Sequence, residues 1–569
     1  MTDHRPWFRT WRAGVPKTVA PFPRQNAFTL LADAAAGFPG STAIAFLGKH
    51  LTYRELLAEV ERFSSVLAGL GVQRGDRVGL LLPNSPQYVI AWYACQRLGA
   101  VVVGNNPLYT RRELSHQIRD CAPQVMVVLD QLYPSWEAVS AEAPVREVVV
   151  TKLTDYMRFP LNLLAPLKFR RDARHEGKPW PPVPAGARVR WWKEAVDSAG
   201  PPPPVADVDA EREPACFVYT GGTTGLSKGA MLSHHNITSN VRQVAPCIPF
   251  ERGNDGVMCI LPFFHSFGLV AMNFGISQAG KLVLLPRFEL HMALKQLAKE
   301  RPSFFPGVPR LFVALNEAPE TRRYDLKSVK ACISGAAPLP QAVADRFREV
   351  TGGANLVEGY GLTETSPVTH VNPLDAPRHG TIGLPIPDTD CRVVSLDDPD
   401  TDVPAGERGE LCISGPQVML GYWNKPEATA EMIRGGWLHT GDVAIMDEDG
   451  FFRIVDRIKD LIIVSGFNVY PTEVEAVLYR HPKVSKVCVV GLPDDRTGER
   501  VKAYVVPTEG ATVTAEELAA WARDPEQGLT GYRVPSEWEF RDSLPETLIG
   551  KVLRRVLVEE ERQRSAAAS

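Results

Sequence analysis

A glycine- and hydroxyl-rich loop that ends in a lysine is the most informative stretch of the sequence. It reads TGGTTGLSKG and directly follows an apolar run, CFVYT at 216–220. Glycines let several backbone N–H groups turn toward one point, hydroxyl groups add donors, and the lysine adds positive charge. The loop therefore suits a polyphosphate, although its composition also fits a glycine-rich surface turn. The residues concerned are Thr220, Gly221, Gly222, Thr223, Thr224, Gly225 and Lys228.

The loop differs from the Walker pattern of P-loop nucleotidases. That pattern requires Gly immediately before the lysine and Ser or Thr immediately after it, where the hydroxyl meets magnesium. Here Ser227 precedes Lys228 and Gly229 follows it. The order of the residues therefore disfavours a P-loop NTPase.

The ordered loop resembles the phosphate-loop signature of the adenylate-forming superfamily, which includes acyl-CoA synthetases, luciferases and peptide-synthetase adenylation domains. Ser227 replaces the family's usual Pro, which lowers the rigidity of the loop but keeps its anion-binding groups. The loop and the insertion described below are most similar to those of bacterial long-chain fatty acid–CoA ligases. Further stretches resemble family motifs in the same order over nearly the whole chain: LPFFHSFGL (261–269), SGAAPL (334–339), EGYGLTET (358–365), WLHTGD (437–442), FRIVDRIKDLIIVSGFNVYPTEVE (452–475) and TLIGKVLRR (547–555).

The resemblance implies an ATP-dependent acid–thiol ligase that acts in two steps. An acid, expected to be a long-chain fatty acid, becomes an acyl-adenylate with release of pyrophosphate, and the acyl group then passes to coenzyme A with release of AMP. ATP, Mg²⁺ and coenzyme A are the implied cofactors. Three alternatives stay open: an acyl-AMP ligase that serves a carrier protein, a CoA ligase for aryl or medium-chain acids, and a non-catalytic lipid- or nucleotide-binding protein. The complete SGFNVYPTEVE string favours free coenzyme A.

By the same resemblance, individual residues take roles around ATP. Tyr360 is expected to stack on adenine and Thr363 to contact the α-phosphate. Glu364 is expected to bind magnesium, a hard cation that prefers carboxylate oxygen, while Asp442 and Arg457 contact the ribose hydroxyls. The full implied nucleotide site is the phosphate loop together with Gly335, Ala336, Ala337, Glu358, Gly359, Tyr360, Gly361, Thr363, Asp442, Arg457 and Lys551.

Two lysines far apart in the sequence, Lys228 and Lys551, are expected to meet at one ATP. Lys551 reaches the ATP site only if a small C-terminal domain closes on that site. There its positive charge would stabilise the transition state as the carboxylate displaces pyrophosphate. The hinge is expected at Lys459 and Asp460. Rotation about it would bring in the coenzyme A contacts Ser465, Gly466 and Phe467, where Gly466 leaves space for the pantetheine arm. The implied catalytic residues are Lys551, Lys228, His265, Thr363 and Glu364.

An uncharged stretch at 256–280 surrounds His265, which resembles the family's gating aromatic near the carboxylate. The small residues that follow predict either a narrow acyl tunnel or tight helix packing, and both interpretations stay open; they are Gly268, Ala271 and Gly275. Pro262, His265 and Asn273 interrupt the stretch, which favours a buried strand–turn–helix over a membrane span.

Apolar strands that alternate with amphipathic helices must position these residues. Strand-like runs at 78–82, 100–103 and 125–129 alternate with helical patterns near 86–98 and 111–120. This pattern predicts an α/β fold with helix-covered parallel sheets. We expect a large multi-subdomain N-terminal domain (1–456), an insertion at about 151–205, a hinge at 457–460 and a small mobile α+β C-terminal domain (461–569). Its elements include a strand at 486–492 and a helix at 515–524.

Composition narrows the class of protein further. The chain has 569 residues and a formal charge of −3, which provides no global field for nucleic acid. Nine cysteines without a CxxC pair, and no secretory signal at the N-terminus, predict a cytoplasmic protein with reduced thiols. The apolar and basic segment 153–174 suits either shallow contact with the inner face of a membrane or packing on the protein's own surface. Monomer and homodimer both stay open.

Overall fold

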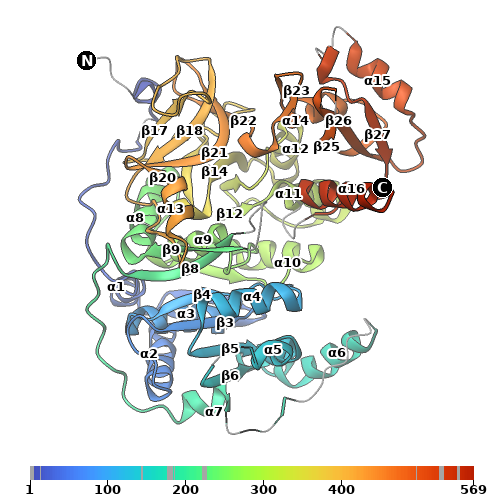
Figure 1. The fold of residues 1–569 in the computed structure, drawn as a ribbon. Helices are drawn as coiled ribbons and strands as arrows, with labels where there is room; N and C mark the ends of the chain where they lie inside the picture. Colours follow the sequence, from blue (N-terminus) through green and yellow to red (C-terminus); the bar gives the residue numbers. More distant parts are fainter. Residues whose placement is uncertain are drawn as a thin grey trace. The chain divides into compact units, whose positions relative to one another are not determined.

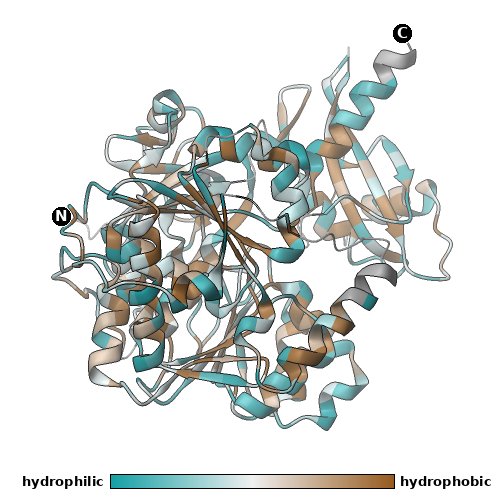
Figure 2. Cartoon of the chain, turned by 90° about the horizontal axis from the view of Figure 1, so that it is seen from below, coloured by the Kyte–Doolittle hydropathy of each residue, from teal (hydrophilic) through white to brown (hydrophobic). Residues whose placement is uncertain are grey.

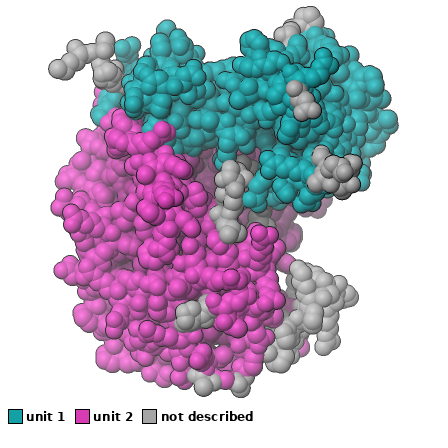
Figure 3. All heavy atoms as spheres, in the orientation of Figure 1, with its two compact units in different colours: residues 1–10, 391–413, 439–569 teal, residues 11–390, 414–438 magenta. Residues whose placement is uncertain are grey.

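The computed structural model forms two compact units, each described by itself (Figures 1 and 3). The first unit, which is magenta and labelled unit 2 in Figure 3, comprises residues 11–390 and 414–438. The second unit, which is teal and labelled unit 1 there, comprises residues 1–10, 391–413 and 439–569. The second unit thus includes segments from before residue 456, so the expected division at 457–460 stays a prediction. The structure describes residues 5–12, 14–142, 145–175, 183–184, 186, 188–220, 227–494, 496–524, 529, 531–546 and 552–568.

A nine-stranded sheet forms one half of the first unit. Its strand order is β16-β15-β14-β13-β12-β10-β11-β1-β2, with parallel pairing from β14 through to β1. The helices α9 (Ser266–Ser277), α10 (Leu290–Glu300), α11 (Pro309–Glu317) and α12 (Gln341–Thr351) connect its parallel strands. The strands are β1 (Thr42–Phe46), β2 (Lys49–Thr52), β10 (Gly256–Cys259), β11 (Lys281–Leu284), β12 (Phe304–Gly307), β13 (Ala331–Ser334), β14 (Asn355–Gly361), β15 (Val368–Val371) and β16 (Leu384–Pro385).

An eight-stranded sheet, ordered β19-β9-β8-β4-β3-β5-β6-β7, forms the other half. Its helices are α2 (Tyr53–Gly69), α3 (Pro86–Leu98), α4 (Arg111–Cys121), α5 (Tyr133–Ser140) and α7 (Trp192–Asp197). The predicted elements between 78 and 129 are confirmed to within about a residue at each end. The strands are β3 (Arg77–Leu81), β4 (Val101–Gly104), β5 (Val125–Leu129), β6 (Glu147–Thr151), β7 (Val189–Trp191), β8 (Pro214–Thr220), β9 (Lys228–Ser233) and β19 (Gly421–Tyr422).

Side chains from both sheets share one hydrophobic core. Every residue of α3 is buried, which is typical of a helix enclosed by other elements. Ser85 caps its first turn and Gly99, in the left-handed conformation, ends it. The strands are largely brown, that is hydrophobic, in Figure 2. The α/β prediction with helix-covered parallel sheets is therefore confirmed.

The uncharged stretch 256–280 forms β10, a turn and α9, as predicted. Ten of the twelve residues of α9 are buried. None of the described helices combines the length and apolar character needed to cross a bilayer.

The segment 151–205 departs from the regular pattern over a shorter range than expected. Its last part, β7 and α7, is built into the fold: β7 pairs in parallel with β6, and the buried Trp192 stacks on Phe63 at 3.9 Å between ring centroids. The irregular part contains α6 (Leu161–His175), which follows a short 3₁₀ turn at Leu153–Tyr156.

The second unit contains two further sheets. One joins β17 (Asp390–Val394), β18 (Arg408–Ser414), β21 (Trp437–Met446) and β22 (Phe452–Arg457). The other joins β23 (Ile462–Val464), β24 (Phe467–Val469), β25 (Val484–Asp494), β26 (Gly498–Pro507) and β27 (Glu537–Phe540) with α14 (Pro471–Leu478), α15 (Ala515–Arg523) and α16 (Arg554–Ala568). The α+β character expected after residue 461 is confirmed. β25 contains the predicted strand 486–492, and α15 matches the predicted helix 515–524 to within one residue.

Candidate active site

Parallel pairing in the nine-stranded sheet brings several predicted site residues to one edge. The carboxyl ends of β10, β12, β13 and β14 lie at this edge, where ligands commonly bind in open α/β sheets. The loop after β10 carries His265, the loop after β13 carries Gly335 to Ala337, and β14 ends in Gly359 to Gly361. Thr363 and Glu364 follow in a 3₁₀ turn, Thr363–Thr365. One topological feature therefore gathers motifs that are about a hundred residues apart.

Glu358 connects the two loops expected around adenine. It faces Ser334 across the β13–β14 pairing, and its carboxylate accepts a hydrogen bond from the backbone N–H of Leu339 at 3.0 Å. Burial raises the pKa of Glu358 to about 7. The ring of Tyr360 lies on the same strand, in edge contact with the ring of His370. A side chain at Gly361 would overlap the backbone of Pro367, which explains a glycine there.

His265 caps the start of α9 and directly precedes a serine that contacts Thr363. Its Nδ1 accepts a hydrogen bond from the N–H of Phe267, and burial lowers its pKa to about 4, so the imidazole is neutral near pH 7. The next residue, Ser266, lies 3.3 Å from Thr363 Oγ1 through its hydroxyl oxygen. The residue next to His265 thus contacts Thr363, and the roles expected of the two residues stay predictions.

Two of the small residues in α9 have packing roles. A Cβ on Gly268 would overlap the carbonyl oxygens of Leu261 and Pro262, and a Cβ on Gly275 would overlap Leu282. Ala271 is buried. The tight-packing interpretation therefore accounts for Gly268 and Gly275, and the acyl tunnel stays a prediction.

Lys228 lies in the eight-stranded sheet, at the start of β9, where it faces Thr220 at the end of β8. The carbonyl of Ser227 lies 2.9 Å from Nε2 of His116, which holds the chain as it enters β9. The Lys228 ammonium lies 5.1 Å from the ring centroid of Tyr422. The phosphate-loop residues Gly221, Gly222, Thr223, Thr224 and Gly225 lie outside the described residues.

Tyr422 joins Lys228 to Glu364. Its strand β19 pairs antiparallel with β9, and its hydroxyl donates a 2.6 Å hydrogen bond to Oε1 of the buried Glu364. Glu364 is fixed a second time through its backbone carbonyl, which accepts from the N–H of Met419 at 2.8 Å. Sequence reasoning missed Tyr422. Its only signal was the aromatic pair in GYW at 421–423, which reads as ordinary core.

The carboxylate of Glu364 fits a magnesium ion that also binds phosphate. Glu364 presents one carboxylate, and Tyr422 engages only one of the two oxygens. An ionised carboxylate has further lone pairs, and Mg²⁺ is commonly held by one or two carboxylates plus substrate phosphates. Glu364 and a nearby Lys228 thus form a pair suited to a magnesium–polyphosphate complex.

The expected ribose contacts lie in the second unit. Asp442 on β21 and Arg457 on β22 are direct partners in the strand register, and Oδ1 of Asp442 lies 3.3 Å from Nε of Arg457. Asp442 is only 5% exposed. The pairing holds the carboxylate in one orientation.

The predicted hinge and coenzyme A residues also lie in the second unit. Lys459 and Asp460 form a 3₁₀ turn with Ile458 directly after β22. Ser465 and Gly466, with φ of +52° and +83°, make the turn between β23 and β24. Apart from its chain neighbours, no heavy atom of the described residues lies within 4 Å of a Cβ built on Gly466. Phe467 stacks on Tyr532 at 5.0 Å between ring centroids.

The segment that carries Lys551 is only partly described, and Lys551 itself lies outside the described residues. Arg554, three residues on, is held by the half-buried Glu475 through two hydrogen bonds of 2.7 and 2.8 Å. It also reaches Asp460 of the predicted hinge at 3.3 Å. Arg554 therefore ties the chain after Lys551 to the hinge turn.

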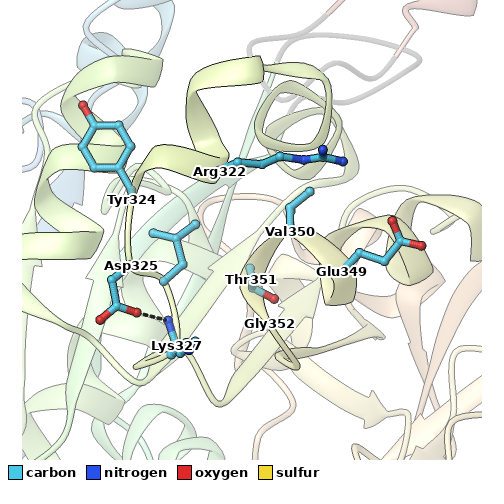
Figure 4. A pocket seen from close by; sticks show the side chains of 9 residues that line it. Arg322, Tyr324, Asp325, Lys327, Glu349, Val350, Thr351 and Gly352 are labelled. Atoms are coloured by element: carbon cyan, nitrogen blue, oxygen red, sulfur yellow. Dashed lines mark hydrogen bonds between the residues drawn. The ribbon is translucent and has the colours of Figure 1, made fainter.

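A separate hollow of about 450 Å³ opens between the 3₁₀ segment Pro319–Arg323 and α12 (Figure 4). Its walls include Arg322, Tyr324, Lys327 and Glu349. None of the predicted site residues lines it, so it is not part of the candidate active site.

Family models and relatives match the chain over almost its whole length. The model described as AMP-binding enzyme matches residues 31–423, and that described as AMP-binding enzyme C-terminal domain matches residues 473–551. The Long-chain-fatty-acid--CoA ligase of Bacillus subtilis (strain 168) is 42% identical over 564 residues, 99% of each chain. The Feruloyl-CoA synthase of an Amycolatopsis species is 36% identical over 524 residues, 91% of this chain and 95% of that protein. The crystal structure of ATP-bound MatB from Rhodopseudomonas palustris has a TM-score of 0.81 and 30% identity, covering 94% of this chain and 99% of that one.

Proposed function

Because this chain belongs to the AMP-binding enzyme family, we propose that it is an ATP-dependent, AMP-forming ligase that joins a long-chain fatty acid to coenzyme A. The grouping of Lys228 and Glu364 about Tyr422 is the structural observation that carries the proposal. It provides one cation and one carboxylate for a magnesium–ATP complex. The relative of 42% identity over 99% of each chain supports the acid and the thiol.

In the first step the fatty acid carboxylate attacks the α-phosphorus of ATP, and pyrophosphate leaves. Lys228 and the preceding loop hold the leaving phosphates, while Thr363 donates to the α-phosphate. Mg²⁺, when bound at Glu364, neutralises phosphate charge. Preorganised charges of this kind stabilise the transition state because they need no reorganisation during the reaction. Asp442 and Arg457 hold the ribose, and Tyr360 covers the adenine.

Lys551 completes this step in the proposal, and the support for its role is the motif IGKVLRR at 549–555. In the proposal, the C-terminal domain brings Lys551 to ATP for the first step. Rotation about Lys459 and Asp460 would then remove it and admit coenzyme A past Gly466. The open space about Gly466 supports this path, since any larger side chain would narrow it.

The carboxylate end of the acid is expected to lie near His265. A neutral imidazole can donate one hydrogen bond without adding a charge that would attract water. The apolar surroundings of α9 suit an acyl chain. A second candidate, a CoA ligase for aromatic acids, is favoured by the 36% identical Feruloyl-CoA synthase.

We also propose that α6 rests on an anionic membrane surface on the cytoplasmic side. Phe159 and four leucines of this segment are between 48% and 72% exposed: Leu161, Leu163, Leu164 and Leu167. Apolar residues this exposed mark an interaction surface. Basic residues flank them in the sequence, including Arg158 and Arg171, which suits anionic headgroups. A substrate that dissolves in the bilayer would enter from such a position.

The direct test of the substrate class is pyrophosphate release with ATP across a panel of acids from acetate to oleate, with ferulate as an aryl acid. The proposal expects the highest kcat/KM with acids of about fourteen carbons or more. A clear preference for ferulate would replace it with the second candidate.

A further inference from the structure

One buried polar cluster in the second unit takes no part in the proposed chemical steps. It consists of Glu410 and Cys412 on β18 and His439 on the neighbouring strand β21 (Figure 1), with one potential ligand atom from each within 4.8 Å of the others. All three side chains are buried. A buried carboxylate next to an imidazole is costly unless it is fully hydrogen-bonded, so its partners show what the cluster does.

Glu410 uses both of its carboxylate oxygens. Oε2 lies 2.8 Å from Nδ1 of His439, and Oε1 accepts a 3.0 Å hydrogen bond from the backbone N–H of Gly441. A carboxylate only accepts hydrogen bonds, so the imidazole Nδ1–H donates. The same N–H faces Sγ of Cys412 at 3.3 Å. A metal ion would have to displace this proton and ionise the thiol. The hydrogen bonds therefore indicate that the cluster holds the backbone of β21 in place and is not a metal centre.

The supported residues lie immediately before Asp442. Gly441 has a φ of +69°, a conformation that favours glycine. The hydroxyl of Thr440 donates to the carbonyl of Leu411 at 2.7 Å and accepts from the N–H of Asp442 at 3.1 Å. Three consecutive residues of β21, His439 to Gly441, are thus attached to β18. The next residue is the expected ribose contact.

We propose that Glu410 is a positioning residue for ribose recognition. Through His439 and Gly441 it fixes the part of β21 that orients the Asp442 carboxylate toward the ribose hydroxyls. This rests on the proposed function. Asp442 contributes to binding by accepting hydrogen bonds from the ribose hydroxyls. A misplaced carboxylate therefore weakens the binding of ATP more than that of a nucleotide without both hydroxyls. The ratio of the two affinities reports on Glu410, whereas a general loss of stability leaves this ratio unchanged.

The test measures binding of ATP and of 2′,3′-dideoxy-ATP, which lacks both hydroxyls, by calorimetry, together with KM and kcat for pyrophosphate release. We expect Glu410→Leu, which removes both hydrogen bonds, to raise the Kd and KM for ATP about tenfold or more and to leave those for the dideoxynucleotide within about threefold. Glu410→Gln should restore most of the discrimination. Its amide oxygen can accept from Gly441, and its NH₂ can donate to the other tautomer of His439.

Two further variants keep the test decisive. Thr440→Val removes only the hydroxyl that links Leu411 to Asp442, and should lower the discrimination in the same direction by about threefold even if Glu410→Leu does not fold. Glu300→Leu is the matched control. Glu300 is a buried carboxylate 3.0 Å from His50, and neither residue is assigned to ATP. It should lower stability and leave the discrimination unchanged.

Unchanged discrimination in folded Glu410→Leu and in Thr440→Val would overturn the proposal. So would one zinc ion per chain in the purified protein that is lost in Cys412→Ala. Failure of the proposed function gives a different result: the wild-type protein would release no pyrophosphate with any acid, while calorimetry would still report the effect of Glu410 on nucleotide binding.

Discussion

The hydroxyl of Tyr422 lies 2.6 Å from a carboxylate oxygen of Glu364. Lys228, the lysine expected to bind phosphate, lies over the ring of the same tyrosine. One aromatic side chain thus contacts both groups expected to hold the magnesium–pyrophosphate end of ATP. Burial and the neighbouring carboxylate raise the pKa of Tyr422, so its hydroxyl stays protonated and donates.

Replacing Tyr422 by Phe should weaken the response to magnesium while leaving the fold intact. The ring stays beneath Lys228, but a hydrogen bond to a charged acceptor, worth about 1.5–3 kcal/mol, is lost. We expect about a tenfold or greater fall in pyrophosphate release and a higher Mg²⁺ concentration at half-maximal rate. Magnesium-dependent quenching of a fluorescent ATP analogue reports the same shift in binding.

Tyr156→Phe is the control, since Tyr156 also donates to a carboxylate, that of Glu59, outside the site. A normal magnesium response in Tyr422→Phe would count against this role.

The ion pair between Arg554 and Glu475 should dominate the stability of the C-terminal sheet. Both side chains are half-buried, with 22% of Arg554 and 13% of Glu475 exposed. Removing one partner therefore costs less than breaking a fully buried pair. Arg554→Leu should lower the free energy of unfolding in urea by about 1.5–3 kcal/mol, the contribution of hydrogen bonds to a charged group. The double variant Arg554→Leu with Glu475→Leu should recover most of the loss. If the double variant is as unstable as the single one, the pair is not the cause.

Glu358 should make stability fall as the pH rises. Its pKa is about 7 in the folded protein against an ordinary value of 4.5. Between these values the unfolded chain releases the proton while the folded protein keeps it, so stability present at pH 4.5 is lost as pH rises toward 7. Glu358→Gln is neutral at every pH and keeps an acceptor for Leu339. We expect its advantage over wild type in urea unfolding to grow by about 1–3 kcal/mol from pH 5 to pH 8. A constant difference would show that the carboxyl of Glu358 has an ordinary pKa.

Charges on the exposed face of α6 should abolish membrane contact. Leu163 and Leu167 are one helical turn apart and both exposed. In sedimentation with vesicles of anionic and zwitterionic lipid, we expect the double variant Leu163→Glu with Leu167→Glu to bind at least about tenfold more weakly than wild type. Leu108→Glu changes another exposed leucine and should bind like wild type. Equal binding of all three proteins, or equal binding to purely zwitterionic vesicles, would contradict the proposal.

Site residues were predictable where the residues with suitable chemistry lie together in one short sequence motif. Tyr360, Thr363 and Glu364 lie within seven residues of one another, and the parallel strands predicted around them bring them to the sheet edge. Tyr422 was not predictable in this way. Its role arises from the pairing of β19 with β9, and nothing near it in the sequence indicates that partner.

The same distinction applies to the fold. The helix at 86–98 was predictable because Ser85, Pro86 and Gly99 mark its ends. The positions of β7 in the eight-stranded sheet and of α7 beside it were not predictable. Prolines and basic residues surround both elements in the sequence, so nothing indicates that Trp192 is buried. Similarly, Gly268 and Gly275 fitted a tunnel or a packed helix equally well until the neighbours of each Cβ position were known.

The central claim is that one chain performs two chemical steps with different sets of residues. It is tested most directly by measuring both half-reactions of Lys551→Ala: pyrophosphate release from ATP and palmitate, and palmitoyl-CoA formation from supplied palmitoyl-adenylate and coenzyme A. The account predicts a loss of about a hundredfold or more in the first and a near wild-type rate in the second. Equal losses in both half-reactions, or no loss in the first, would contradict it.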